Sequence, residues 1–384
     1  MATLFTGARI FDGDALLSGD MLIEDGEIAA ILPAGKGGQC ADIIRLPGGI
    51  LAPGFVDLQL NGGGGLMLND RPEVATVERM AKAHGGLGAL TILPTLITDT
   101  PEIARKAVEA VAQAAKRLPG IAGIHLEGPH LSLARKGAHD PALIRPMSDD
   151  DLAFLLAASE RLPRLLTTLA PESVTMEQIS TLSRAGIVVS LGHTDCSYAD
   201  ARAASKAGAR VATHLFNAMS QLGNREPGLV GAVLDDGGFS AGLIADAIHV
   251  HPAAMCAALA AKTGPGEIFL VTDAMAPAGT DLVVFTLNGR KIRRENGRLT
   301  LADGTLAGAD LDLARALRVL RDQVALPLDR SLRMATLGPA RVLGRDDRAG
   351  RLVAGRSADM IHLSDSLHLC AVWQAGTPVP LSPV

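Results

Sequence analysis

The 384-residue sequence predicts an α/β fold, namely a (β/α)8 TIM-like barrel with a small β domain assembled from both ends of the chain. Two observations lead to this prediction. Apolar runs of strand length alternate with helical stretches through the middle of the chain, and short alternating runs bounded by turns occupy both ends. The chain is also long enough for a barrel of about 250 residues and an accessory domain.

The central region carries eight strand candidates with helical stretches between them. The strands are predicted over residues 54–60, 89–94, 121–126, 165–170, 187–191, 211–214, 241–244 and 268–272. Helices are predicted over 72–85, 100–117, 148–161, 175–185, 197–208 and 252–263. A doubly wound open sheet usually has fewer strands, so the count favours the barrel.

Other segments read as antiparallel strands. Asp25-Gly26 is a turn signal between the apolar runs 21–23 and 28–31, and similar runs recur at 351–355, 359–363 and 371–376. We expect these ends to pair in one small β domain. The stretch 282–300, with turns at Asn288-Gly289 and Asn296-Gly297, predicts a hairpin inserted after the eighth strand.

Composition excludes several classes of protein. No run reaches the roughly 18 apolar residues of a membrane helix, and the N-terminus lacks a signal-peptide pattern. The cysteines form no CxxC pair and read as reduced thiols (Cys40, Cys196, Cys256, Cys370). A net charge of −5, without an evident basic cluster, argues against nucleic acid as a partner. We expect a cytoplasmic protein that binds neither membrane nor nucleic acid.

Polar residues at the ends of apolar runs are the candidate site residues, because barrel active sites lie at the carboxyl ends of strands. These residues are Glu127, His193, His214 and Asp273. Two imidazoles and a carboxylate form a three-ligand set that suits catalytic Zn²⁺, although Fe²⁺, Mn²⁺ and Co²⁺ also accept it. Asp273 has the chemistry of a ligand or a general base, and we assign it to proton transfer.

Structural roles compete with these assignments. A single buried histidine at a strand end is as often a donor to a backbone carbonyl, but two at successive strand ends favour a metal site. His125 shares a strand face with Glu127, and we expect it to pack or to support the site. The glycine run 62–65 lacks the following Gly-Lys-Ser/Thr of a phosphate-binding loop, so it predicts a tight turn that leaves room for a substrate.

Several motifs together resemble a known family. They are Pro53-Gly54-Phe55-Val56-Asp57, Pro94-Thr95-Leu96-Ile97-Thr98, His125-Leu126-Glu127-Gly128-Pro129, Gly192-His193-Thr194, Thr213-His214-Leu215-Phe216-Asn217-Ala218-Met219, Pro227-Gly228-Leu229-Val230-Gly231, Ile244-Ala245-Asp246, Val271-Thr272-Asp273-Ala274 and Thr305-Leu306-Ala307-Gly308. In this order and spacing the chain resembles the amidohydrolase superfamily, and within it the N-acetylglucosamine-6-phosphate deacetylases.

The resemblance implies a β-sandwich formed by residues 1–52 and 346–384, and a metal-dependent barrel over residues 53–345. It implies that Glu127, His193 and His214 hold one divalent ion, most often Zn²⁺, and that Asp273 is the catalytic acid and base. It also implies a homodimer in which Arg225 reaches the neighbouring active site. The implied substrate contacts are Ala138, His139, Asn217, Ala218, Arg225, Asp246, Ala247, Ile248, His249, Leu306, Ala307 and Gly308.

One departure from the superfamily concerns a second metal. Many members carry His-x-His at the end of the first strand, where this chain has Gln59 and Asn61. Neutral amides are poor ligands for a borderline divalent ion, so we expect a degenerate second metal site and a mononuclear centre.

The expected reaction is hydrolysis of the acetamido group of N-acetyl-D-glucosamine 6-phosphate, giving D-glucosamine 6-phosphate and acetate in amino-sugar recycling. Two alternatives stay open within the superfamily, a deacetylase for N-acetylgalactosamine 6-phosphate and a cyclic-amide hydrolase. A third alternative is a non-catalytic sugar-phosphate binding protein on the same scaffold.

Overall fold

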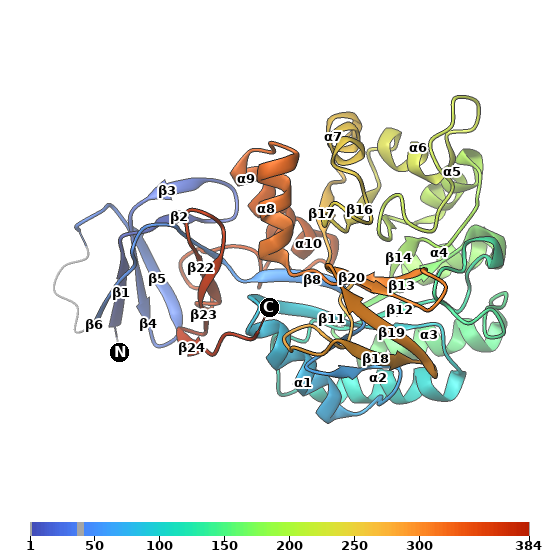
Figure 1. Cartoon of the computed structure of the whole chain (residues 1–384), viewed down its shortest axis with the longest axis horizontal. Helices are drawn as coiled ribbons and strands as arrows, with labels where there is room; N and C mark the ends of the chain where they lie inside the picture. The colour runs from blue at the N-terminus through green and yellow to red at the C-terminus, as the bar shows by residue number, and fades with distance from the viewer. Residues whose placement is uncertain (1, 37–41, 384) are drawn as a thin grey trace.

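The chain folds around eight parallel strands, as the sequence predicts (Figure 1). The computed structural model describes residues 2–36 and 42–383. The barrel strands are β8 (Phe55–Leu60), β11 (Ala89–Ile97), β12 (Ile124–Glu127), β13 (Leu165–Leu169), β14 (Val188–Leu191), β15 (Val211–Ala212), β16 (Ser240–Leu243) and β17 (Ile268–Leu270). Their carboxyl ends therefore meet at one mouth, where loops can gather polar side chains.

Backbone contacts join the first and last barrel strands. Residues Leu60 and Ala274 form a parallel bridge, and the Asp273 N–H donates to the Gln59 carbonyl at 2.9 Å. The Asn61 N–H donates to the carbonyl of Ala274 at 2.7 Å. The sheet thus closes next to three candidate site residues, Gln59, Asn61 and Asp273.

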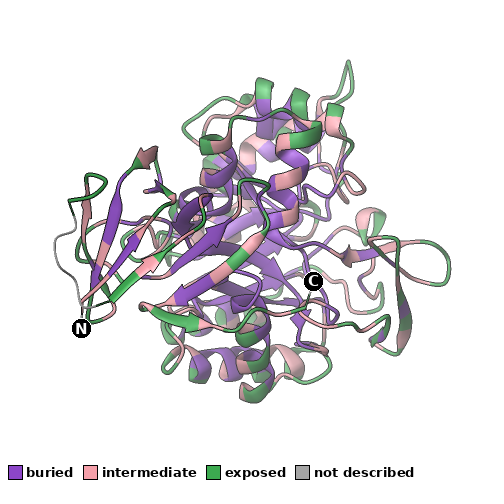
Figure 2. Cartoon of the chain, turned by 60° about the vertical axis from the view of Figure 1, so that its left-hand side comes forward, coloured by how far each residue is buried: buried purple, intermediate pink, exposed green. Residues whose placement is uncertain are grey.

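Helices surround the barrel, and several begin at side-chain caps. They are α1 (Val74–Gly85), α2 (Pro101–Ala115), α3 (Asp149–Arg161), α4 (Met176–Arg184), α5 (Tyr198–Ala207), α6 (Gly228–Asp235), α7 (Pro252–Ala261), α8 (Leu313–Gln323), α9 (Leu328–Ala335) and α10 (Leu337–Val342), with the 3₁₀ turns η1 (Leu133–Arg135) and η2 (Pro171–Ser173). Ser148, Thr175 and Ser197 form capping boxes, which satisfy backbone donors at the starts of α3, α4 and α5. Figure 2 shows the buried barrel strands surrounded by helices that expose only part of their surface.

Both ends of the chain contribute to two further sheets. One contains β5 (Glu27–Leu32), β4 (Asp20–Glu24), β1 (Ala2–Thr6) and β6 (Asp42–Arg45) in that order. The other contains β24 (Thr377–Val379), β23 (Leu369–Gln374), β22 (Met360–Leu363), β7 (Ile50–Pro53), β2 (Arg9–Phe11) and β3 (Leu16–Ser18). Phe5 from the first sheet meets Trp373 from the second edge-to-face, with ring centroids 5.1 Å apart. The predicted fold class is confirmed.

The predicted insertion after the eighth strand is an antiparallel sheet. It contains β18 (Val284–Leu287), β19 (Arg290–Glu295), β20 (Arg298–Thr300) and β21 (Leu306–Ala309), and its first two turns are the predicted Asn-Gly pairs. Asn288 and Asn296 adopt positive φ angles of 49° and 52°, as such tight turns require. The Ala309 N–H donates to the Asp273 carbonyl at 2.8 Å, so this sheet adjoins the barrel mouth. A further short pair, β9 (Gly62–Gly63) and β10 (Leu66–Met67), contains the predicted glycine turn.

Within residues 2–36 and 42–383, no helix is long and apolar enough to cross a membrane. Cys196, Cys256 and Cys370 are free thiols, whereas Cys40 lies outside the described residues.

Candidate active site and metal centre

Three ligand-type atoms converge at the barrel mouth, from the ends of β12, β14 and β15. His193 Nε2 lies 3.2 Å from Glu127 Oε1, and His214 Nε2 lies 3.1 Å from the same oxygen. The two Nε2 atoms are 3.1 Å apart. Ligands on a tetrahedral Zn²⁺ at about 2.0–2.2 Å would stand about 3.3–3.6 Å from one another. The triangle therefore fits the donor set and spacing of a divalent metal site.

The protonation of these groups also suits a cation. His193 Nδ1 donates to the Arg135 carbonyl at 2.8 Å, so the neutral ring would present the lone pair of Nε2 to a metal. Burial would raise the pKa of Glu127, but hydrogen bonds from His193 and His214 hold it well below its usual range. Burial opposes charge on His214, yet its contacts with Glu127 raise its pKa. A metal ion would replace the proton that the carboxylate holds on the imidazole.

Asp273 lies beside this triangle and is held by two amides. The Asn61 side chain donates to Asp273 Oδ1 at 2.7 Å, and Gln59 Nε2 donates to the same oxygen at 3.3 Å. Gln59 Nε2 also lies 3.3 Å from both carboxylate oxygens of Glu127. The amides thus present N–H donors to the two carboxylates. Burial, followed by the charge of Glu127, raises the pKa of Asp273 to about 6.

The backbone is strained where it presents these side chains. His193, His214 and Asp273 have φ angles of 48°, 32° and 51°, in the left-handed region that side chains other than glycine rarely adopt. Each such residue costs on the order of 1–3 kcal/mol, which the surrounding packing must offset. All three lie just after a barrel strand, where the chain turns into its loop.

A cavity of about 280 Å³ opens over these groups. Most of the predicted substrate contacts line it: Ala138, His139, Asn217, Ala218, His249, Leu306, Ala307 and Gly308. Asn61, Glu127, His193, His214 and Asp273 line it as well. The structure therefore brings together predicted residues that are separated by more than 240 positions in the sequence.

His139 lies beside the triangle, but its hydrogen bonds favour a donor role over ligation. The Thr98 N–H donates to His139 Nδ1 at 3.3 Å, and the Thr98 hydroxyl lies 2.7 Å from the same nitrogen. A backbone N–H can only donate, so the ring proton resides on Nε2. His139 shares a possible ligand cluster with Glu127 and His193. However, a protonated Nε2 cannot ligate a metal. Burial and the neighbouring His193 lower the pKa of His139 well below its usual range, so the ring is a neutral donor.

Of the predicted substrate contacts that follow β16, one lines the cavity and the others lie behind it. His249 lines the cavity and bonds through Nδ1 to Asp246 Oδ2 at 2.6 Å. Asp246 itself is buried and also accepts from the backbone N–H groups of Ile248 and His249. Burial would raise the pKa of Asp246, but the hydrogen bond from His249 leads a net lowering. Asp246, Ala247 and Ile248 do not line the cavity and instead support the loop that carries His249.

Arg225 is predicted to contact the substrate, but it lies outside the cavity of its own chain. It belongs to an exposed loop, residues 221–226, and does not line the cavity. This loop precedes α6 and projects beyond the helical layer in Figure 1. Its position is compatible with a contact to a second copy, which stays a prediction.

His125 lies beneath the site and takes part in a network of hydroxyl groups. Its Nε2 is 2.7 Å from the Thr168 hydroxyl, which lies 2.6 Å from the Thr213 hydroxyl. Burial lowers the pKa of His125 to about 4, so the ring is neutral. The expectation that His125 supports the site agrees with these contacts.

Sequence reasoning missed several residues of the cavity wall, including Gly137, Met275 and Leu287. Gly308, which it did include, has a steric role. A Cβ there would lie 2.5 Å from Met275 Cγ and 2.7 Å from the Asp273 carbonyl, and its φ is +63°. Gly308 and Met275 come together only when the β18–β21 sheet folds against the barrel mouth. No local sequence pattern could therefore have identified this part of the cavity wall.

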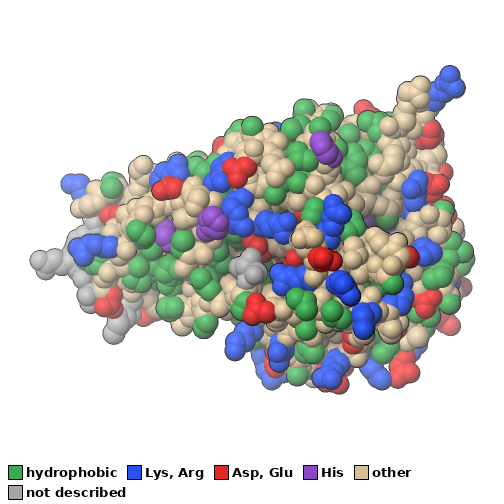
Figure 3. Space-filling view, in the orientation of Figure 1, with side chains coloured by type: hydrophobic (Ala, Val, Ile, Leu, Met, Phe, Trp, Pro, Cys, Tyr) green, Lys and Arg blue, Asp and Glu red, His purple; other side chains and the backbone are tan. Residues whose placement is uncertain are grey.

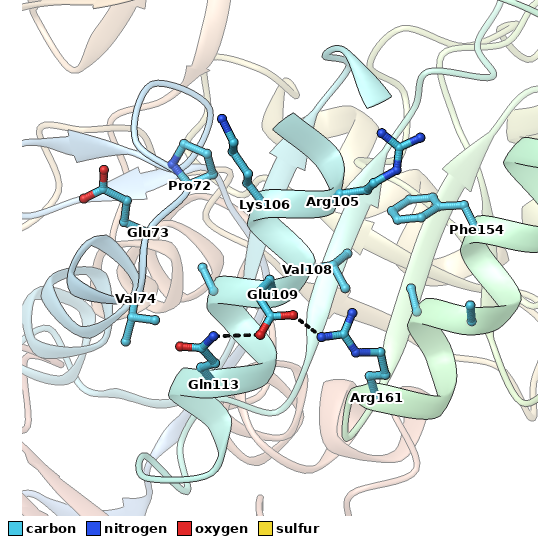
Figure 4. A pocket seen from close by; sticks show the side chains of 13 residues that line it. Pro72, Glu73, Val74, Arg105, Lys106, Val108, Glu109, Gln113, Phe154 and Arg161 are labelled. Atoms are coloured by element: carbon cyan, nitrogen blue, oxygen red, sulfur yellow. Dashed lines mark hydrogen bonds and ion pairs between the residues drawn. The ribbon is translucent and has the colours of Figure 1, made fainter. Parts of the chain in front are cut away.

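A larger groove, of about 610 Å³, lies between α2 and α3 on the outer surface of the barrel (Figure 4). Its side chains include an ion pair between Arg161 and Glu109, which also accepts from Gln113. It contains neither histidine nor any of the strand-end residues. The groove is therefore separate from the candidate active site.

Comparisons with known proteins agree with this geometry. Residues 50–378 match the amidohydrolase family model. The N-acetylgalactosamine-6-phosphate deacetylase of Shewanella sp. (strain ANA-3) is 44% identical over 86% of this chain and 84% of that protein. The N-acetylglucosamine-6-phosphate deacetylase of Haemophilus influenzae is 36% identical over 90% of this chain and 91% of that protein.

A solved structure extends the likeness to the whole fold. The N-acetylglucosamine-6-phosphate deacetylase of Pasteurella multocida is similar at a TM-score of 0.94, with 32% identity over 98% of this chain and 99% of that one. The chain belongs to the amidohydrolase family, and within it to the amino-sugar 6-phosphate deacetylases.

Proposed function

We propose that this chain hydrolyses the acetamido group of N-acetyl-D-glucosamine 6-phosphate, releasing acetate and D-glucosamine 6-phosphate in amino-sugar recycling. The observation that carries the proposal is the triangle of His193, His214 and Glu127 with Asp273 beside it, open to a cavity. Amidohydrolases act on amide bonds with a metal, and this site has both the donor set and an adjacent acid–base group. We also propose a division into two domains, a β-sandwich (residues 1–52 and 346–384) and a barrel (53–345) that carries the site.

One divalent ion, with Zn²⁺ as the first candidate, would be held by Glu127, His193 and His214. When bound there, it supplies Lewis acidity that lowers the pKa of water towards about 7 and polarises a carbonyl. Gln59 and Asn61 offer amide donors in place of a second set of ligands, which supports a mononuclear centre.

The chain's own residues supply the proton transfers. Asp273, as a carboxylate, would accept a proton from the attacking water and then deliver it to the sugar nitrogen, so that the amine can leave. The Nε2–H of His139 would donate to the acetyl carbonyl oxygen, on which negative charge develops. Asn61 and Gln59 would hold the Asp273 carboxylate in position for both transfers.

The substrate would be held by the walls of the cavity and by a second subunit. Ala138, Asn217, Ala218, and Leu306 to Gly308 would contact the sugar, and His249 would face the phosphate. We further propose a cytoplasmic homodimer in which the exposed Arg225 reaches the phosphate bound by its neighbour. The loop's exposure and the absence of Arg225 from the lining of its own cavity support this arrangement.

A second substrate has specific support. The Shewanella relative at 44% identity is an N-acetylgalactosamine-6-phosphate deacetylase, and its substrate differs from the first at a single hydroxyl. A galactosamine preference is therefore the alternative function.

The decisive experiment measures acetate release from N-acetylglucosamine 6-phosphate, its galactosamine isomer and unphosphorylated N-acetylglucosamine, with and without a chelator. Chelator-sensitive turnover that is fastest with the first substrate supports the proposal. Faster turnover of the galactosamine isomer selects the alternative. If metal-loaded protein releases no acetate from any of the three, the deacetylase proposal is wrong.

A further inference from the structure

A phosphate-bearing substrate needs positive charge that the lining of the cavity does not supply. Among the described residues, no lysine or arginine lines it, whereas Glu127 and Asp273 both do. A phosphate monoester carries a charge of about −1.5 to −2 at neutral pH. Among the histidines of the wall, His249 is already engaged by Asp246. Beyond the Arg225 proposed to reach in from a neighbouring subunit, permanent positive charge for such a ligand must come from residues of this chain that lie behind the lining.

Arg290, the first residue of β19, lies next to the cavity wall. Its Nη2 donates to the carbonyl of Ala138 at 2.5 Å, and Ala138 lines the cavity. No carboxylate in the described ranges pairs with Arg290, although its side chain is partly buried. Arg290 is thus a cation beside the cavity without a counter-ion.

The hairpin that contains Arg290 concentrates positive charge. Residues 290–300 contain five basic residues and one acidic residue, whereas the whole chain has a net charge of −5. Arg294 is neutralised by Asp310 at 2.9 Å, but Lys291 and Arg293 are exposed on the outer face of β19. Figure 3 shows lysine and arginine side chains gathered in the region of β18–β20. The expectation of no basic cluster was wrong, because the positive charges of this hairpin are locally dominant.

We propose that Arg290 supplies, from the same chain, a permanent cation for the phosphate of an anionic substrate, and that Lys291 and Arg293 increase substrate capture through their field. The inference rests on the proposed function and deepens it, because it assigns a further determinant of selectivity for the phosphorylated sugar. Charges placed around a cleft raise the local concentration of an oppositely charged ligand, and this effect weakens with salt.

The test compares phosphorylated and unphosphorylated substrate in Arg290→Gln and Arg290→Lys. We expect Arg290→Gln to reduce the ratio of kcat/KM for the two sugars about 10- to 100-fold, because a partly buried cation next to the cavity attracts the phosphate through a medium less polar than water. Arg290→Lys should keep most of the ratio. The ratio separates charge from structure, because a loosened Ala138 loop would slow both sugars equally. Where the unphosphorylated sugar turns over too slowly, inhibition by glucosamine 6-phosphate and by glucosamine gives the same ratio.

The field effect is tested by the double variant Lys291→Gln/Arg293→Gln. A matched control is Arg184→Gln/Lys206→Gln, whose exposed residues end α4 and α5 and so lie at the opposite end of the barrel. We expect only the hairpin variant to lower kcat/KM for the phosphorylated sugar, and the difference to vanish at high salt with kcat unchanged.

Two results would overturn the inference. An unchanged substrate ratio in Arg290→Gln removes the phosphate role of Arg290, and equal effects of the hairpin and control variants remove the field effect. Failure of the wild-type protein to hydrolyse any N-acetylated amino-sugar phosphate would instead refute the proposed function, so the two failures are distinguishable.

Discussion

Asp57 should make the protein less stable as the pH rises, and Asp57→Asn should remove this loss. The carboxyl group is fully buried at the base of the site, where burial raises its pKa to about 7. Its hydrogen bonds favour the charged form without compensating for burial. Thr272 Oγ1 lies 2.5 Å from Oδ2, and the backbone N–H groups of Gln59 and Thr272 donate to Oδ1 at 3.2 Å.

The magnitude follows from the shift. The unfolded chain ionises Asp57 near pH 3.8 and the folded chain near pH 7, so the folded state holds an extra proton between these values. Stability therefore falls from about pH 4 to about pH 7 and stays lower above it. A shift of about three units corresponds to about 4 kcal/mol. Asparagine keeps the shape, because its oxygen accepts from the same backbone groups and its nitrogen donates to Thr272.

The assay is urea denaturation of both proteins between pH 5 and pH 8, with chelator present so that metal loading does not vary. Asp57→Asn should become the more stable protein as the pH rises, by up to about 4 kcal/mol at pH 8. The exposed Asp281→Asn serves as a control for a general loss of charge. A variant that is less stable at pH 8, or a difference that does not grow with pH, would refute the assignment of a neutral buried carboxyl group.

Four further outcomes are expected at the site. Thr98→Val should lower kcat about 10- to 100-fold with little change in KM, because His139 loses the hydroxyl that orients it, whereas Thr98→Ser should restore turnover; equal losses in both variants would contradict this role. Without metal, burial and a neighbouring carboxylate raise the pKa of Asp273 to about 6. A bound cation would lower this pKa, so kcat/KM of the metal-loaded enzyme should fall only as the pH drops below about 6, and a fall that begins above about pH 6 would contradict this. Asp273→Asn should cost roughly 10²- to 10⁴-fold in rate with metal still bound, and near-normal turnover would end its acid–base assignment. Gly308→Ala should reduce both activity and melting temperature, since its Cβ would meet Met275 Cγ at 2.5 Å; an unchanged melting temperature would show that the wall yields.

The barrel was predictable because its parallel strands are buried on both faces and therefore appear as apolar runs. The limits of the prediction lie at the mouth. The run 211–214 yields only β15 (Val211–Ala212), since His214 turns into the left-handed region and leaves the ladder. Helix α6 was not among the predicted helices, because its apolar residues are buried all round and give no amphipathic pattern.

The candidate site was predictable in its centre and not in its surroundings. Glu127, His193 and His214 follow apolar runs, so topology alone gathers them. The bond from Thr98 to His139 and the contact of Arg290 with Ala138 join segments whose approach depends on how loops fold back. No periodicity in the sequence encodes such contacts, and the three-dimensional structure was needed to find them.

The left-handed backbone at His193, His214 and Asp273 places thermal stability and catalytic activity in conflict. Glycine relaxes such a conformation without a steric penalty, so a glycine at any of these positions recovers backbone energy while it deletes a functional side chain. A laboratory selection on thermal survival alone would therefore tend to erase the site one residue at a time. A selection for greater thermal stability of this protein should therefore measure acetate release in every round.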